Sequence, residues 1–288
     1  MIRILILFIL IGTACSKKQD NSFSFVFMTD VHITPKNQAE DGFRKAIDSI
    51  NALHPAFVIS GGDQVKDALD QPWEIADSLY NMYLRNINRI SSPIYNTLGN
   101  HDVFGLYQQK KIGTDHPDFG KNMYERKLGP RYYSFTYKNW KFFILDAIQL
   151  TLDNYFGYID STQRQWITEE IKKTDTATYI ALVSHIPFLS LSHLNRNNLP
   201  LDSTIMVLNN NEILTLFTGY QVRLVLQGHL HYYENNVENN IYYITGGSIS
   251  GAWWKGVKNN TEEGFCFLTV NNSDIHCRYV DYQWEAKK

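Results

Sequence analysis

Residues 99–102 read "GNHD" and follow the apolar run "PIYNTL" at 93–98. One polar residue at the end of a buried strand is ordinary turn chemistry. An amide, an imidazole and a carboxylate in succession indicate side chains that face a ligand, and Gly99 lets the backbone bend sharply just before them. Other stretches of the chain repeat this pattern, in which an apolar strand is followed directly by polar side chains.

Outward from this motif, apolar runs with strand character alternate with helical patterns. Strands that end in polar groups are predicted within 22–32, 56–63, 93–102, 178–188 and 223–231, and an antiparallel pair within 131–147 turns at Lys138 and Asn139. Helices are predicted at 40–53, 71–90 and 161–173, the last with a Ser or Thr cap. This order favours an α/β core with parallel strands and antiparallel additions.

The polar residues at the strand ends form one chemical set. They are Asp30, His32, Asp63, Asn100, His101, Asp102, His185, His229 and His231. In an open α/β sheet the carboxyl ends of neighbouring strands converge on one crevice, so we expect these side chains to lie together. Five of the nine histidines of the chain belong to the set. Because such a group is costly to desolvate without a cation, independent core histidines are the weaker interpretation.

Seven ligands are more than one metal ion normally takes from a protein, whereas two ions that share a carboxylate use this number well. Oxygen and imidazole ligands without thiolate suit Mn, Fe or Zn. Two such ions, about 3.5–4 Å apart, clamp the entering and leaving oxygens of a phosphoryl transfer. In "GNHD" we interpret Asn100 as a neutral ligand, His101 as the acid that protonates the leaving oxygen, and Asp102 as the group that orients His101.

The sequence resembles the calcineurin-like metallophosphoesterases. The resemblance runs through "DVH" at 30–32, "GGD" at 61–63, "GNHD" at 99–102, "VSH" at 183–185 and "GHLH" at 228–231. It implies a four-layer α/β/β/α sandwich of two mixed β-sheets flanked by helices, within a domain at 22–285. The implied activity is that of a metal-dependent phosphoesterase, in which a hydroxide held by two metal ions attacks a phosphate mono- or diester in line.

The resemblance also implies a ligand assignment. Asp30, His32, Asp63 and His231 would hold one ion, and Asp63, Asn100, His185 and His229 the other, with Asp63 as the bridge. The stretch from "RYYSF" at 131–135 to "DSTQRQWI" at 160–167 is similar to the exported, purple-acid-phosphatase-like branch. That branch has an iron-binding Tyr three residues after the bridging Asp, where this chain has Lys66. The resemblance therefore implies a centre without purple iron and leaves the metal open.

Two stretches are candidates for contacts with a small phosphorylated substrate. "GGSISGAWWKG" at 246–256 follows the "GHLH" strand by one hairpin, and Trp253 with Trp254 would form a stacking wall for a base or sugar. The alternative is a pair of Trp that caps a hydrophobic edge. In "SLSHLNRNNLP" at 190–200, His193 or Arg196 would reach a phosphate, or the stretch is a solvated loop. Lys66 has the same two interpretations, a phosphate contact or a solvated loop Lys.

The N-terminus predicts export. One Arg precedes the apolar run "ILILFILI" at 4–11, which is too short to span a bilayer and is typical of a signal peptide. Residues 1–14 then resemble a lipoprotein signal that ends before an acylated Cys15, although Gly12 replaces the usual Leu. The alternative is ordinary cleavage near Ala14. We expect an exported protein, held at the periplasmic or outer face of a membrane only by this lipid.

Composition and cysteine usage limit the remaining possibilities. A formal net charge of −2 without a Lys/Arg run argues against specific nucleic-acid binding. Cys266 and Cys277 fall in a predicted hairpin that pairs Val270 with Ile275. In this register the two cysteines lie two residues apart along the paired strands, so a disulfide between them is not favoured. Two other functions stay open: a dinuclear hydrolase of a non-phosphate bond, and a non-catalytic metal-binding scaffold on the same fold.

Overall fold

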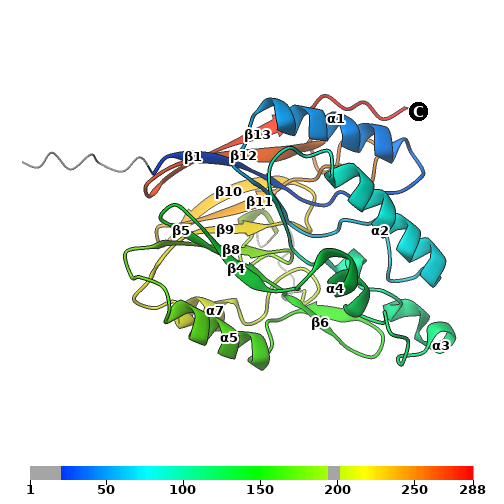
Figure 1. The fold of residues 1–288 in the computed structure, drawn as a ribbon, viewed down its shortest axis with the longest axis horizontal. Helices are drawn as coiled ribbons and strands as arrows, with labels where there is room; N and C mark the ends of the chain where they lie inside the picture. The colour runs from blue at the N-terminus through cyan, green and yellow to red at the C-terminus, as the bar shows by residue number, and fades with distance from the viewer. Residues whose placement is uncertain (1–20, 194–201, 288) are drawn as a thin grey trace, which may run out of the picture.

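A computed structural model describes residues 21–193 and 202–287. Two large sheets pack face to face, and helices cover their outer faces (Figure 1). Helices α1 (Ala39–Ala52) and α2 (Trp73–Ile87) lie over the first sheet, whereas α5 (Ser161–Ile171) and α7 (Asn210–Leu216) lie over the second. The four layers predicted from the family resemblance are confirmed.

The first sheet has the strand order β13-β12-β1-β2-β3. Its strands are β1 (Phe23–Met28), β2 (Val58–Ser60), β3 (Ile94–Asn96), β12 (Gly264–Asn271) and β13 (Asp274–Asp281). Strands β1, β2 and β3 are parallel, and β12 runs antiparallel to both β1 and β13. The loops that carry the polar groups after β1, β2 and β3 therefore leave the sheet at the same edge.

The second sheet has the order β10-β11-β9-β8-β5-β4. Its strands are β4 (Tyr133–Tyr137), β5 (Trp140–Leu145), β8 (Tyr179–Ser184), β9 (Gln221–Gln227), β10 (Tyr233–Glu238) and β11 (Ile241–Gly246). Strands β5, β8, β9 and β11 are parallel, with antiparallel β4 and β10 at the edges. His185 follows β8 and "GHLH" follows β9, so this sheet also directs its polar groups to one edge.

Side-chain alternation in β1 accounts for the double layer. Phe25 and Phe27 point into an apolar layer between the sheets, while Val26 and Met28 belong to the layer under the helices. Phe25 meets the ring of Phe142 from β5 edge-on, with the centroids 5.6 Å apart. A strand that is buried on both faces reads as a continuous apolar run, as "FVFM" does.

Helix α1 forms because its apolar residues recur at helical spacing. Phe43, Ala46, Ile47 and Ile50 are all buried against the first sheet, and Glu40 lies in the first turn, where a carboxylate suits the helix dipole. The remaining elements are short connections that lie outside the two large sheets. Among the described residues they include a two-stranded sheet of β6 (Ile148–Leu150) and β7 (Tyr155–Gly157), the helices α3 (Gln109–Ile112) and α4 (Asn122–Leu128), and the 3₁₀ helices η1 (Asn100–Asp102) and η2 (Leu106–Gln108).

Several local predictions can be compared with the structure. The hairpin of β12 and β13 pairs Val270 with Ile275, as expected, and Cys266 and Cys277 are free thiols. The predicted Ser or Thr cap of α5 is wrong, since the carboxylate of Asp160 accepts the capping bond from the Gln163 backbone N–H at 2.8 Å. Within 21–193 and 202–287, no helix is long and apolar enough to cross a membrane. Cys15 and residues 1–14 lie outside the described residues.

Candidate metal centre

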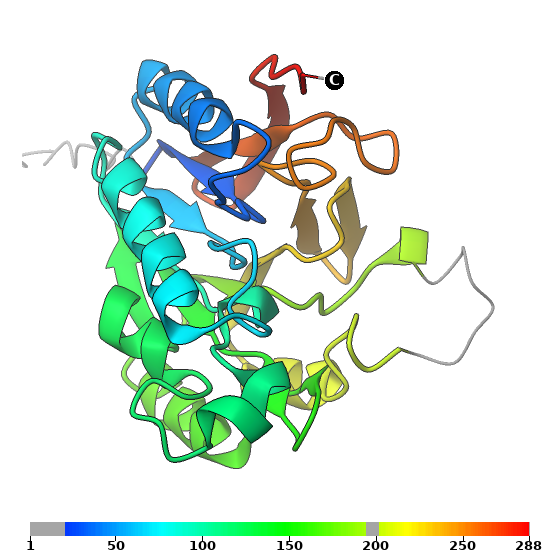
Figure 2. The same ribbon diagram turned by 90° about the vertical axis from the view of Figure 1, so that its right-hand side faces the viewer.

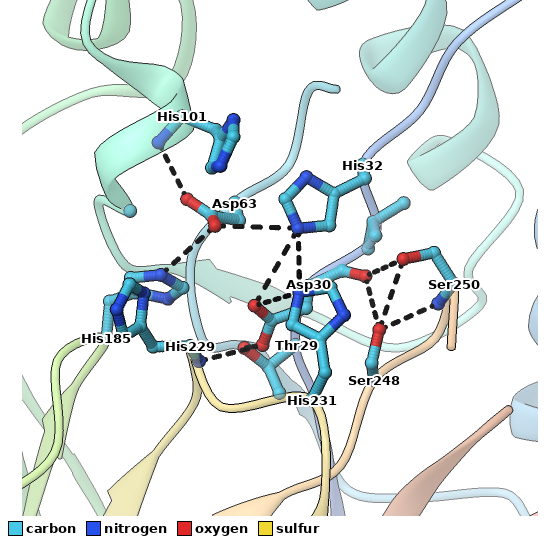
Figure 3. Close-up of polar contacts among 12 residues, drawn as sticks. Thr29, Asp30, His32, Asp63, His101, His185, His229, His231, Ser248 and Ser250 are labelled. Carbon is cyan, nitrogen blue, oxygen red and sulfur yellow. Dashed lines mark hydrogen bonds and ion pairs between the residues drawn. The ribbon is translucent and has the colours of Figure 1, made fainter. Parts of the chain in front are cut away.

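The strand ends of both sheets converge on one site. Figure 3 shows side chains from the β1, β2 and β3 loops of the first sheet facing side chains from the β8 and β9 loops of the second. Figure 2 shows the loops of the two sheets meeting at this edge. We call the seven predicted ligands the strand-end cluster. Its members are Asp30, His32, Asp63, Asn100, His185, His229 and His231.

Asp63 lies at the centre of the strand-end cluster and is 2% exposed. One of its carboxylate oxygens, Oδ2, lies 3.2 Å from His185 Nε2 and 3.5 Å from His32 Nε2. The other, Oδ1, accepts a hydrogen bond from the His101 backbone N–H at 2.8 Å. The carboxylate is therefore held in place through one oxygen and faces imidazoles from two different sheets with the other.

On one side of Asp63, three side chains direct a donor atom to a common point. Ligand atoms of Asp30, His32 and His231 lie within 4.8 Å of one another. His231 Nε2 is 3.2 Å from Asp30 Oδ1 and 3.0 Å from His32 Nε2. Asp30 is fixed through Oδ2, which accepts hydrogen bonds from the Thr29 hydroxyl at 2.7 Å and from the His229 backbone N–H at 3.0 Å.

On the other side, Asp63 groups with His185 and His229, and their ligand atoms again lie within 4.8 Å of one another. Asn100 joins this group, since its side-chain oxygen lies 3.2 Å from His185 Nε2. Asp63 also lies next to the first group, since its Oδ2 is 3.5 Å from His32 Nε2. The structure thus brings all seven predicted ligands together.

Most of these side chains belong to residues with a left-handed backbone conformation. Five members of the strand-end cluster have left-handed φ angles between 46° and 72°: Asp30, His32, Asp63, His229 and His231. This region is sparsely populated by residues with a Cβ and costs of order 1 kcal/mol or more at each position. Strain of this kind persists where surrounding contacts hold it, and it clusters at functional sites.

The glycines of the motifs permit close packing of the loops. A Cβ at Gly99 would lie 2.1 Å from the Asp63 backbone nitrogen, and a Cβ at Gly228 would lie 2.2 Å from the Thr29 hydroxyl oxygen. Neither neighbour can move without displacing a carboxylate of the cluster. This explains why "GNHD" and "GHLH" each begin with the residue that has no side chain.

Backbone carbonyl groups set the tautomers of two imidazoles. His185 Nδ1 donates to the Gly61 carbonyl oxygen at 2.8 Å, and His231 Nδ1 donates to the Gly251 carbonyl oxygen at 2.6 Å. Because a carbonyl only accepts, these Nδ1 atoms carry the protons, and the Nε2 atoms of the neutral rings have a lone pair for a ligand.

Two serines that the sequence reasoning missed also support the site. The hydroxyls of Ser248 and Ser250 both donate to the Asp30 carbonyl oxygen, at 3.0 and 2.8 Å (Figure 3). They stabilise the left-handed backbone at Asp30 from the loop after β11. In the sequence, the sign of this role is the presence of two hydroxyls within the glycine-rich motif "GGSISG" at 246–251.

Burial and neighbouring charges shift the pKa values of two imidazoles of the cluster in opposite directions. Burial favours the neutral form of His185, but the Asp63 carboxylate outweighs it and raises the pKa to about 9. Burial and the neighbouring His185 lower the pKa of His229 to about 3. The Asp63 carboxylate thus stabilises positive charge at this point of the cluster, and a bound cation would supply that charge in place of the His185 proton, while His229 is neutral.

The residues present fit a bound cation. Asp30 Oδ1 is buried and has no hydrogen-bond donor among the described residues, although it faces His231 Nε2. A buried carboxylate oxygen without a donor is costly, and the Nε2 atoms of His32 and His231 lie 3.0 Å apart, close enough for both to donate a lone pair to a shared cation. Oxygen and imidazole donors of this kind suit divalent transition metals.

A family model described as calcineurin-like phosphoesterase matches residues 23–233. The chain belongs to the calcineurin-like phosphoesterase family. The match covers all five sequence motifs and therefore every member of the strand-end cluster.

Individual relatives agree with this membership. Over 113 residues the phosphoesterase is 32% identical to a 3',5'-cyclic-nucleotide phosphodiesterase of Nostoc sp., a match that covers 38% of this chain and 39% of that protein. A dimetal phosphatase from Danio rerio has the same fold, with 12% identity and a TM-score of 0.61 over 88% of this chain and 98% of that one. The purple acid phosphatase PPD1 of yellow lupin gives 12% identity and a TM-score of 0.59, with coverages of 93% and 53%.

The role predicted for Asp102 in this phosphoesterase is wrong. Its carboxylate does not contact His101: Oδ2 accepts from the backbone N–H groups of Asp63 and Gly99, at 3.0 and 2.8 Å. Oδ1 accepts from the N–H groups of Gln64 and Val65, at 2.9 and 3.3 Å. With four donors from the β2 and β3 loops, Asp102 joins these loops and has no oxygen left to orient an imidazole.

His101 lies next to the strand-end cluster. Its ring meets that of His32 edge-on with centroids 4.8 Å apart, and a ring nitrogen lies within 4.8 Å of the ligand atoms of His32 and Asp63. The Nδ1 atom is buried and has no partner among the described residues. The imidazole is therefore free to exchange a proton with a group bound at the centre.

The predicted substrate contacts meet different outcomes. Trp254 is 1% exposed, and its indole N–H donates to the carbonyl oxygens of Val31 and His32 at 3.0 and 3.1 Å, so it is a core residue and not a stacking wall. Its neighbour Trp253 lies beside the cluster, with its ring centroid 4.9 Å from that of His231. His193 is partly buried at the end of the β8 loop segment, and its backbone N–H donates to the Ser190 hydroxyl at 3.1 Å. Arg196 lies outside the described residues.

Proposed function

We propose that this phosphoesterase hydrolyses small phosphate mono- or diesters at a dinuclear metal centre. Asp30, His32 and His231 would hold one ion, Asn100, His185 and His229 would hold the other, and Asp63 would contribute to both sites. One observation carries the proposal: a single oxygen of Asp63 faces imidazoles of both donor groups, at 3.2 and 3.5 Å. One carboxylate shared between two groups is the arrangement that two-metal hydrolysis requires.

When bound, the ions would supply the positive charge that stabilises the phosphoryl group and activates water as the nucleophile. The protein supplies position and protons. Asp102 fixes the loop that carries Asp63, and the Gly61 and Gly251 carbonyl oxygens fix the orientation of His185 and His231. The free imidazole of His101 protonates the leaving oxygen.

The Nostoc relative supports the choice of substrate class. That protein is named as a phosphodiesterase of cyclic nucleotides, which are small phosphate diesters. A substrate of this size suits a centre that is formed by loop residues at the edge of two sheets.

Metal analysis joined to turnover tests the proposal. The purified protein should bind about two ions per chain and hydrolyse p-nitrophenyl phosphate, bis-p-nitrophenyl phosphate or both. Asp63→Ala should lose both ions and turnover, whereas Asp48→Ala, which changes an exposed carboxylate on α1, should keep them. Two bound ions without turnover of either ester would support a scaffold or a non-phosphate hydrolase instead. If the Asp63→Ala variant keeps both ions, the proposed bridging role of Asp63 is wrong.

A further inference from the structure

A group of lysines without carboxylate partners surrounds Trp253 next to the strand-end cluster. The Lys258 amine lies 3.6 Å from the centroid of the Trp253 ring, and the Lys66 amine lies 5.2 Å from it. The same ring lies 4.9 Å from the imidazole of His231 and 6.1 Å from that of His32, measured between centroids. One indole thus connects two cations with two predicted metal ligands.

Neither the Lys66 amine nor the Lys258 amine forms an ion pair, and only longer-range attraction acts on them, from Asp67 and Asp63 on Lys66 and from Asp30 on Lys258. No carboxylate of the described residues lies within ion-pair distance of Lys66, Lys255 or Lys258. Asp67 is the nearest in sequence, but its Oδ1 accepts from the Leu69 backbone N–H at 2.9 Å in a local turn. Burial lowers the pKa of both Lys66 and Lys258. Partly desolvated cations without partners are stabilised by a bound anion.

Trp253 and two of the lysines, Lys66 and Lys255, line an open space, whereas Lys258 is not among its lining residues. A cavity of about 640 Å³ lies beside Trp253, and its lining includes Lys36, Asn37, Lys66 and Lys255. The cavity therefore carries several positive charges and, among its lining residues, the single carboxylate of Asp67. Its volume is sufficient for a small organic phosphate.

Trp253 is held in place by strained backbone. It has a left-handed φ of 55°, and the next residue, Trp254, has a φ of 66° and is anchored in the core by its indole N–H. The Trp253 indole N–H is buried and has no acceptor within the described part of the chain. A fixed aromatic ring with an unused donor, beneath a lysine amine, is the environment of a binding site.

We propose that Lys66, Lys258 and Trp253 form an anion-binding subsite for a second negative group of the substrate. The inference rests on the proposed function and names its substrate class: phosphate esters that carry a further phosphate or carboxylate on the part that is not cleaved. The reacting phosphate occupies the metal centre while the second anion displaces Lys258 from the Trp253 face.

Three alkyl phosphates of equal chain length test this preference: propyl phosphate, 3-(phosphonooxy)propanoate and propane-1,3-diyl bisphosphate. Phosphate release should show a kcat/KM about 10- to 100-fold higher for the bisphosphate than for propyl phosphate, the range expected for charge-assisted hydrogen bonds. The carboxylate substrate shows whether the subsite requires a phosphate. The ratio should collapse in Lys66→Gln and Lys258→Gln, and stay as in the wild type in Lys172→Gln, which changes an exposed lysine at the end of α5.

A binding measurement without metal separates this inference from the proposed function. Inorganic phosphate should change the tryptophan fluorescence of the metal-depleted protein, and the change should vanish in Trp253→Phe and weaken in Lys258→Gln. If none of the three esters is hydrolysed although metals are bound, the proposed function fails, and this titration still decides the subsite. A flat titration, or an unchanged substrate ratio in both lysine variants, would overturn the subsite.

Discussion

The carboxylate of Asp102 accepts a hydrogen bond from the backbone N–H of Asp63 at 3.0 Å, so the β3 loop holds the central carboxylate of the β2 loop in place. Both residues are buried, and neither has the other's role. Asp63 directs its side chain to the imidazoles of the strand-end cluster, whereas the side chain of Asp102 accepts hydrogen bonds from backbone N–H groups. The acid of "GGD", Asp63, is thus a predicted ligand, and the acid of "GNHD", Asp102, holds the loop that carries it.

Asp102→Asn should lower thermal stability and metal affinity together. The amide nitrogen would face backbone N–H donors, and leaving buried donors unsatisfied costs about 1–3 kcal/mol. Calorimetry and metal titration check this, with Asp48→Asn on the surface of α1 as the control. A variant that keeps its stability and both ions but loses proton transfer would restore the orienting role first predicted for Asp102.

Removal of both hydroxyls in Ser248→Ala/Ser250→Ala should weaken one metal site. The Asp30 carbonyl oxygen would lose donors at 3.0 and 2.8 Å, and the left-handed backbone at Asp30 would lose its support. Outer-shell partners of ligands are typically worth about 10- to 100-fold in metal affinity. A two-site binding isotherm should therefore show one weakened site and one unchanged site. Equal weakening of both sites would mean that the serines support the fold in general.

Asn100→Ala and His101→Ala should fail in different ways. Asn100 is proposed as a ligand, so its loss should weaken one ion, and excess metal should partly restore turnover. His101→Ala should keep both ions and lose about 10²–10⁴-fold in rate. That loss should be larger for alkyl than for aryl phosphates, because an alkoxide needs a proton to leave and a nitrophenolate does not.

The comparison of substrates decides the role of His101. Metal content and kcat/KM are measured for both variants with p-nitrophenyl phosphate and an alkyl phosphate. Equal losses on both substrates, with metals in place, would show that His101 stabilises charge on the phosphoryl group. Loss of an ion from His101→Ala would make it a ligand, since its ring nitrogen already lies close to His32 and Asp63.

Stability in acid should depend on Glu170. Hydrogen bonds from Lys141, Lys173 and Ser134 hold the carboxylate, and the Lys141 amine at 2.6 Å contributes most to lowering its pKa to about 2. Because the folded pKa lies below the unfolded value, the contribution is fully present above about pH 4.5 and is lost as the pH falls towards 2.

Glu170→Gln should therefore be less stable than the wild type at pH 7, and the difference in Tm should shrink between pH 4.5 and 2. Thermal unfolding across this range checks the prediction, with Glu169→Gln as the control on the adjacent exposed position of α5. A difference that is independent of pH would show that the ion pair with the buried Lys141 contributes nothing through its charge.

Cys15→Ala should abolish lipid labelling and leave the phosphoesterase folded and active in solution. We propose this because Cys15 follows a short apolar segment and precedes the first strand, which begins at Phe23. Metabolic labelling with a fatty acid, followed by fractionation, checks the anchor. If the wild type is exported but not labelled, the prediction of a signal peptide stands and the prediction of a lipid anchor is wrong.

The sequence predicted the parts of the site that repeat a pattern. Each member of the strand-end cluster follows an apolar strand, so periodicity and residue type were sufficient to find Asp63 or His185 before the fold was known. Contacts to backbone leave no such pattern. The four N–H groups bound by Asp102 and the carbonyl oxygen bound by Ser250 exist only after distant loops meet.

Trp253 and Trp254 show the same limit. They are adjacent, identical in type and both left-handed in backbone, yet one lies beside the metal centre and the other in the core. Neither helical nor strand periodicity applies to such backbone, so the sequence could not decide between them. Only the acceptors at Val31 and His32 distinguish the core indole from its neighbour.

The pairing of β1 with β12 has a consequence for how the enzyme forms. Phe23 lies opposite Val270, so the strand that carries Asp30 finds its antiparallel neighbour only after most of the polypeptide has been synthesised. Contacts between such distant segments are slow to form because a long loop must be ordered first. A nascent chain that already contains all five motifs still lacks Ser248 and Ser250, which fix Asp30. We therefore expect metal binding at the proposed centre to follow the synthesis of the loop that carries these two serines.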